Sequence, residues 1–146
     1  MKKLFTIILL LVSLNITAQN KHRERIKSLK ISVITKKLDL TVKEAQQFWP
    51  IYNTNEKKIS AIKFKEIKAI RKEIREHIDT MTNEKANKLL NRLNSAETRI
   101  HQLRTDLTNK LSGIISSKKI IQLKLAEDDF KRRMLQEYKK RKKEKG

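Results

Sequence analysis

The 146-residue chain contains no cysteine, one proline, two glycines and only 5% aromatic residues. Without cysteine, no disulfide can stabilise the fold and no thiol chemistry is available. The scarcity of turn-forming residues excludes a protein built from many short strands. The sequence therefore predicts one all-α domain whose stability comes from helix packing.

Acidic residues are also scarce, with 16 Asp and Glu against 36 Lys and Arg and a formal net charge of +20. Such an excess of positive charge opposes compactness through self-repulsion and attracts anionic surfaces. The composition therefore favours an acidic partner or anionic surroundings, without identifying the partner.

The chain has one long apolar run, residues 4–12, which follows Lys2 and Lys3 and precedes a small residue, Ala18. A basic start, a short apolar core and a small residue before the cut are typical of a secretory signal peptide. We expect cleavage after Ala18, so that the mature chain begins at Gln19 outside the cytoplasm. The alternative is an uncleaved membrane anchor, although the run is shorter than the ~20 residues that a span needs.

Apolar residues recur at three- and four-residue steps through four segments, which predicts four amphipathic helices. The expected helices cover residues 21–37, 41–79, 82–111 and 118–140. We divide the chain into a leader of residues 1–18, a helical domain of residues 19–138 and a basic, frayed tail of residues 139–146. Gly113 follows the third segment, where a helix end favours a residue that tolerates positive φ.

The second segment opens on a capping motif around which the chain is organised. Thr41 can accept a hydrogen bond from the backbone N–H of Glu44, Glu44 can reach back to the N–H of Thr41, and Leu40 can close the entry as a hydrophobic staple. The only tryptophan, Trp49, and the only proline, Pro50, follow within the same helix. Pro50 predicts a kink or a break just before it. We interpret both residues as core and kink rather than as a ligand cage.

The Leu-Thr-x-x-Glu-Ala-Gln start at Leu40 has a Met-Thr counterpart at Met81, 41 residues later. With the Glu-Ala-x-x-Phe-Trp-Pro-x-Tyr stretch that begins at Glu44, the chain resembles the Spy/CpxP (LTxxQ-motif) family of periplasmic stress proteins. It is most similar to a Bacteroidetes branch described as sensors of ECF-type sigma factors. Glu44 stands where the family motif has glutamine.

The resemblance implies four helices bent into a hairpin or hook. It also implies an antiparallel homodimer with a cradle-like concave face, which binds unfolded proteins without ATP. The expected function is therefore that of a periplasmic chaperone-like or envelope-stress-sensing protein. One alternative is a regulator of an ECF sigma factor or a sensor kinase without chaperone activity. If the chain is not exported, its charge favours a nucleic-acid-binding helical protein instead.

Basic rows lie beside apolar rows along the second and third expected helices. Such rows can attract acidic segments at long range and offer aliphatic surface to apolar side chains. We predict a client-binding face formed by Phe64, Lys68, Arg71, Arg75, Lys88, Arg92 and Arg99. The alternative is that both rows are solvated flanks of a packed bundle.

No nucleophile with a base, no Gly-rich phosphate loop and no paired carboxylates in an apolar pocket can be assembled from the sequence. We therefore expect neither enzyme activity nor a cofactor. The three histidines, His22, His77 and His101, are too dispersed to predict a metal site. An anionic membrane surface is a further candidate partner, because the helices are basic and amphipathic.

Overall fold

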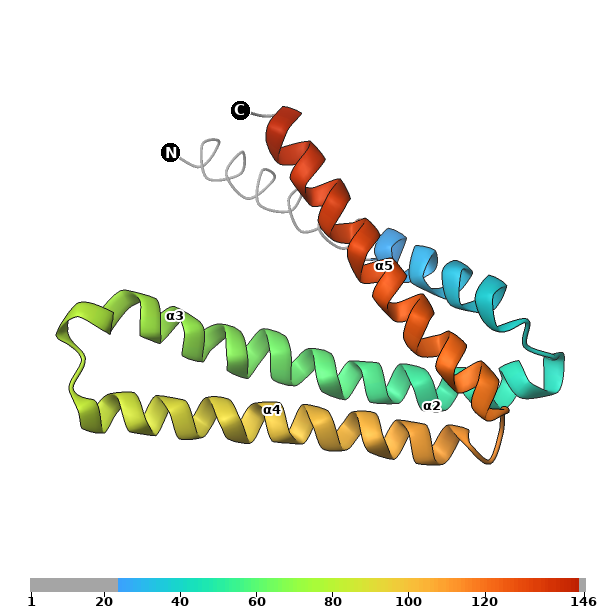
Figure 1. The fold of residues 1–146 in the computed structure, drawn as a ribbon, viewed down its shortest axis with the longest axis horizontal. Helices are drawn as coiled ribbons and strands as arrows, with labels where there is room; N and C mark the ends of the chain where they lie inside the picture. Colours follow the sequence, from blue (N-terminus) through green and yellow to red (C-terminus); the bar gives the residue numbers. More distant parts are fainter. Residues whose placement is uncertain (1–23, 145–146) are drawn as a thin grey trace, which may run out of the picture. The chain divides into compact units, whose positions relative to one another are not determined.

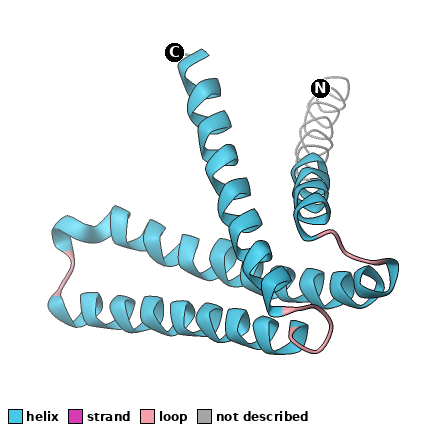
Figure 2. Ribbon diagram, turned by 45° about the vertical axis from the view of Figure 1, so that its right-hand side comes forward, coloured by secondary structure: helices cyan, strands magenta, loops and turns pink. Residues whose placement is uncertain are grey.

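The structure is a computed structural model that describes residues 24–144, and these form helices joined by short loops, with no strand among them (Figures 1 and 2). The all-α prediction is confirmed. The expected leader lies outside the described residues. A first helix covers residues 24–38 and is followed by α2 (Val42–Ala61), the π-helix η1 (Ile62–Ile67), α3 (Lys68–His77), the 3-10 turn η2 (Ile78–Thr80), α4 (Asn83–Leu111) and α5 (Ser117–Glu144).

The chain divides into two compact units, whereas the sequence predicts one domain. The unit Leu40–Ile120 is a helical hairpin, with α2, η1 and α3 as one arm and α4 lying alongside as the other (Figure 1). The second unit combines the first helix with the part of α5 that follows Ile120. There, the Lys37 Nζ atom lies 3.3 Å from the Asp129 Oδ2 atom.

The core of the hairpin is aliphatic and comes from both arms. Its buried residues are Ile59, Ile62, Ile67, Ala96 and Ile100, and Leu93 and Leu103 pack against them. Ala96 is fully buried between the arms, and because its side chain is small, the two arms can approach each other closely there. Removal of these side chains from water is the main force that holds the arms together.

The π-helix η1 corrects a mismatch in the apolar spacing of the first arm. Ile62 and Ile67 are both buried, yet they are five residues apart, one more than an α-helical step on the same face. A π-helix forms i→i+5 hydrogen bonds and accommodates one additional residue per turn. Ile67 and Ile70 thus face α4, as Ile59 and Ile62 do about two turns earlier.

The capping box at the start of α2 is confirmed. The Thr41 N–H donates to the Glu44 Oε2 atom over 2.8 Å, and the Glu44 N–H donates to the Thr41 hydroxyl over 3.2 Å. The Glu44 Oε2 atom also accepts a hydrogen bond of 2.7 Å from the Lys119 ammonium group. The hydrogen bond from Lys119 is the main cause of the lowered pKa of Glu44, and the bond from the Thr41 N–H is the second. The second predicted cap is present too, because Thr82 accepts from the Lys85 N–H over 3.3 Å.

Pro50 lies inside α2 and does not end the helix, so the break that the sequence allowed for is not there. Pro50 and Gln46 are both exposed, and the Gln46 carbonyl that loses its helical partner can therefore be hydrated. The neighbouring aromatic rings pack together, with Phe48 stacked on Tyr52 and Trp49 edge-to-face with both. The Phe48 ring centroid lies 4.9 Å from that of Trp49 and 5.3 Å from that of Tyr52, and Phe48 is fully buried.

One expectation near a helix end is wrong. Gly113 does not adopt positive φ, because the turn after α4 stays right-handed and the N–H groups of Ile114 and Ile115 both donate to the Leu111 carbonyl over 2.9 Å. Positive φ occurs instead at Asp39, at 45°, where the first helix ends. Helix α5 extends to Glu144, through most of the residues assigned above to the basic tail. Lys and Arg are good helix formers and interact favourably with a helix C-terminus.

Candidate functional site

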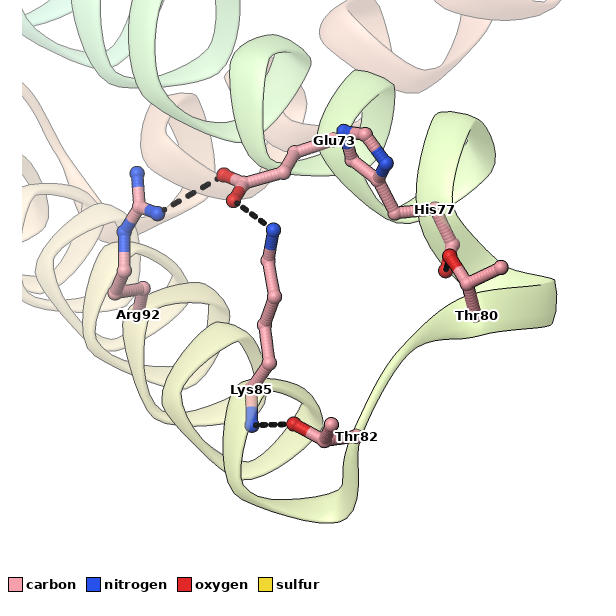
Figure 3. A network of polar contacts seen from close by, with 6 residues as sticks. All are labelled: Glu73, His77, Thr80, Thr82, Lys85 and Arg92. Atoms are coloured by element: carbon pink, nitrogen blue, oxygen red, sulfur yellow. Dashed lines mark hydrogen bonds and ion pairs between the residues drawn. The ribbon is translucent and has the colours of Figure 1, made fainter.

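One face of the hairpin, which we call the Glu73 face, carries ion pairs between its arms and consists of Glu66, Glu73, Lys85, Arg92 and Arg99. Glu73, on α3, accepts from two α4 residues at once (Figure 3). Its Oε1 atom lies 3.3 Å from the Lys85 Nζ atom, and its Oε2 atom lies 3.2 Å from the Arg92 Nη1 atom. One carboxylate therefore neutralises part of the charge of two cations.

A second pair on the Glu73 face joins Glu66 to Arg99 through two parallel hydrogen bonds, one of them 3.1 Å long between Nη1 and Oε1. This bidentate geometry is the strongest form of an arginine-carboxylate pair. The hydrogen bond from Arg99 lowers the pKa of Glu66 and, in turn, raises that of Arg99. The pKa of Glu73 is lowered chiefly by its hydrogen bond from Lys85.

The two pairs share one register. Glu73 follows Glu66 by seven residues on the first arm, and Arg92 precedes Arg99 by seven on the second. In an antiparallel hairpin, equal steps in opposite directions along two helices keep facing residues together. The seven-residue spacing of the acids on one arm therefore matches that of the arginines on the other, and it fixes which cations are neutralised.

Two shallow grooves run along the Glu73 face between the arms. One has a volume of about 450 Å³ and is lined by Glu66, Ala69, Arg92, Ser95 and Arg99 among others. The other has a volume of about 460 Å³ and lies at the turn of the hairpin, beside Glu73, Lys85 and Lys88. Lys88 lies 2.7 Å from Glu84 on its own helix. Lys65 also lines the first groove and has no carboxylate partner within residues 24–144, whereas the other cations in both grooves are paired with glutamates.

Asn55 is a buried polar residue in the otherwise apolar interface between α2 and α4. Its Nδ2 atom donates to the Leu103 carbonyl over 2.8 Å, while its Oδ1 atom is buried and has no hydrogen-bond partner in the described part of the chain. Asn55 also lines a groove of about 330 Å³ beside Pro50 and Asp106. A buried carbonyl oxygen without a partner costs stability, so this amide marks a weak point in the packing.

The opposite side of the hairpin, which we call the Arg71 face, consists of Phe64, Lys68, Arg71, Arg75 and Leu90. A shift of two residues rotates a side chain by about 200° around a helix. Phe64, Arg71 and Leu90 each stand two residues before a member of the Glu73 face, and they therefore point away from it. Lys68 and Arg75 join Arg71 at three- and four-residue spacing.

The side chains of the Arg71 face are open to solvent. Phe64 is 71% exposed and Leu90 is 53% exposed, and both are large apolar residues. Lys68, Arg71 and Arg75 are also exposed, and within residues 24–144 none of their side chains takes part in a hydrogen bond or an ion pair. This face therefore combines exposed apolar surface with cations that lack carboxylate partners in the described part of the chain.

The structure does not bring the seven predicted client-binding residues onto one surface. Four of them, Phe64, Lys68, Arg71 and Arg75, form most of the Arg71 face. The other three, Lys88, Arg92 and Arg99, line the grooves on the opposite side and are paired with glutamates. The sequence analysis missed Leu90 as a member of the first set and Glu66 and Glu73 as partners of the second.

Residues 24–144 contain no group of three or more His, Cys, Asp or Glu side chains placed to hold a metal ion. None of the helices in the same range has both the length and the apolar character of a membrane span. The described chain is thus an all-helical protein with a basic and apolar hairpin face. Comparisons with family models, with curated proteins and with solved structures found no match.

Proposed function

We propose that this chain is an exported, ATP-independent holding protein that captures unfolded segments of other proteins on its Arg71 face. The observation that carries the proposal is the combination on that face of two exposed apolar residues and three exposed cations that have no carboxylate partner among residues 24–144. The resemblance of the Leu40–Tyr52 stretch to the Spy/CpxP family supports it, as does the leader-like start of the sequence.

The mechanism follows from the two kinds of side chain. Lys68, Arg71 and Arg75 attract acidic segments over a distance of about one Debye length, ~8–10 Å at physiological ionic strength. Phe64 and Leu90 then provide apolar contact for side chains that an unfolded protein exposes. Because the contacts are few and solvent-exposed, capture is weak and reversible, and a client can leave and fold without an energy source.

A homodimer would place two copies of the Arg71 face in one particle. Two linked weak sites bind an unfolded chain more tightly than one, because the second contact becomes intramolecular. The cradle-like antiparallel dimer implied by the resemblance therefore belongs to the same proposal. Light scattering of the purified protein gives its oligomeric state directly.

The proposal is tested by measuring how much protein suppresses aggregation of an unfolded model client. Changing Lys68, Arg71 and Arg75 together to Ser should weaken capture about tenfold, since each exposed charge contributes up to about 0.5 kcal/mol. The charge-matched control changes Lys43, Lys110 and Lys118 to Ser. All three are exposed and stand at least 20 residues along the chain from every member of the Arg71 face.

Equal weakening by both triple variants would show that net charge acts and that the Arg71 face does not. If the wild-type protein gives no suppression but binds one envelope sensor or anti-sigma factor tightly, the chain is a regulator and not a chaperone. Recovery of the unprocessed chain from the cytosol, bound to nucleic acid, would overturn the exported function altogether. Mass spectrometry of the protein recovered from cells defines its N-terminus.

A further inference from the structure

The last turns of α5 have the highest density of positive charge in the described chain. Residues 131–143 include eight basic side chains and one acidic side chain, Glu137, all on one helix. One of the cations, Arg132, is paired with Asp129 over 3.0 Å. The remaining charge lies at a helix C-terminus, where the backbone dipole favours cations and thus helps to keep the helix folded.

Two large apolar residues are exposed within this basic segment. Leu135 is 53% exposed and Tyr138 is 68% exposed. Along the helix, Lys131, Leu135, Tyr138 and Lys142 follow at spacings of four, three and four residues, so they form one stripe. The stripe therefore has an apolar centre with a lysine at each end, and all four side chains are exposed.

We propose that this end of α5 docks onto the surface of an anionic phospholipid bilayer. The complementary charge is that of the lipid phosphates, toward which the basic cluster is attracted. A helix with a basic polar side and exposed apolar residues lies in the interface with its apolar side chains among the headgroups and upper acyl chains. Leu135 supplies aliphatic contact, and Tyr138 combines an apolar ring with a hydroxyl suited to the headgroup region.

The exposed apolar residues favour a bilayer over a nucleic acid. Non-specific binding of duplex DNA comes almost entirely from cations at the phosphates, and the duplex backbone offers Leu135 no apolar layer in which to be buried. In a bilayer, the lysines at the ends of the stripe can extend their aliphatic stems along the apolar surface and keep their ammonium groups at the phosphates. This docking surface is on α5, so it is separate from the Arg71 face and does not depend on the proposed client binding.

The test measures co-sedimentation of the full chain, as recovered from cells, with two kinds of vesicle. One is pure phosphatidylcholine, and the other contains about one-third phosphatidylglycerol, which gives the surface the negative potential that basic segments need. The readout is the partition coefficient for anionic vesicles divided by that for neutral vesicles. An apolar leader, if retained, would raise both coefficients by a similar factor and would therefore cancel in the ratio. We expect strong preference for the anionic vesicles at low salt and its loss at high salt.

Changing Lys139, Lys140 and Lys142 to Ser should lower the anionic-to-neutral ratio of partition coefficients about 100-fold, because each lysine near an anionic surface strengthens binding about fivefold. The Lys43, Lys110 and Lys118 triple variant loses the same charge away from the last turns of α5 and should keep the wild-type ratio. Circular dichroism of each variant checks that helicity is retained.

Leu135→Ser combined with Tyr138→Ser distinguishes lipid from nucleic acid. It should weaken binding to anionic vesicles about tenfold, because the inserted apolar area is lost. Binding of duplex DNA that exceeds vesicle binding, and that is unchanged in this variant, would overturn the proposal in favour of a nucleic-acid site. Equal partitioning of the wild-type protein into neutral and anionic vesicles would overturn it as well.

Discussion

The Glu73 face and the Arg71 face lie on the same two arms of the hairpin, yet their cations have different environments. On the Glu73 face, Arg92 and Arg99 pair with carboxylates of the other arm. On the Arg71 face, Lys68, Arg71 and Arg75 have no carboxylate partner in the described chain. The difference shows that the position of the few acids decides which cations stabilise the hairpin and which remain available to a partner.

Both faces depend on the apolar core between the arms, so the largest effect is expected there. Ile100 is 5% exposed and packs in the buried cluster of the hairpin. Ile100→Ala should lower the free energy of unfolding by about 2–5 kcal/mol, through lost apolar burial and the cavity left behind. Urea denaturation followed by circular dichroism measures this. A loss below about 0.5 kcal/mol, as for a surface change, would mean that the arms do not pack as described.

The helix caps fix where each arm begins, and they give the next largest effect. Thr41→Ala should lower the free energy of unfolding by about 1 kcal/mol, because the Glu44 N–H loses its acceptor. Thr82→Ala removes the corresponding acceptor for the Lys85 N–H and should have an effect of similar size. Thermal melting of both variants tests this. A melting curve identical to that of the wild type would mean that the helix does not begin at that cap.

Asn55 places a buried amide oxygen without a hydrogen-bond partner in the described chain between the arms, and its effect on the free energy of unfolding can be compared with that of the ion pairs. Asn55→Leu removes the unpartnered Oδ1 atom and adds apolar contact with α4, while the Leu103 carbonyl stays within its helix. The free energy of unfolding should therefore rise by up to about 1 kcal/mol. A control, Asn53→Leu, alters an exposed amide two residues away and should have little effect. A decrease for Asn55→Leu would show that its hydrogen bond outweighs the buried oxygen.

The features that sequence reasoning predicts correctly are those set by neighbouring residues. The caps at Thr41 and Thr82 depend on groups three residues away, and the apolar stripe of α4 on steps of three and four. The π-helix η1 was not predicted, because Pro50 is the strongest signal in the sequence for an irregularity in this helix. The five-residue step from Ile62 to Ile67 is a local signal that could have located it.

The pairing of cations was not predictable from either helix alone. Arg99 and Glu66 are 33 residues apart, and their contact requires the register of the folded hairpin. The matching seven-residue steps in the two arms could have indicated that register once a turn near Met81 was assumed. Asn55 gave no such signal, since a polar residue in an apolar stripe is equally consistent with a solvated position.

The smallest expected effect is a difference between the faces in acid. The pKa values of Glu66 and Glu73 are lowered in the folded protein, by hydrogen bonds from Arg99 and Lys85 respectively. A carboxylate whose folded pKa lies below its ordinary value of 4.5 adds stability above that pH, and this stability is lost as the pH falls through the folded pKa. Glu66→Gln with Glu73→Gln should therefore flatten the loss of stability below pH 4.5.

Glu97 provides the control because it stands two residues before Arg99 and points toward the Arg71 side. Glu97→Gln should leave the acid limb of the stability curve as steep as in the wild type, since no ion pair within residues 24–144 involves Glu97. Urea midpoints measured from neutral pH down to pH values below 4.5 compare the variants. If Glu97→Gln flattens the curve as much as the double variant does, acid stability reflects total charge. The ion pairs of the Glu73 face would then not be the cause of the loss of stability in acid.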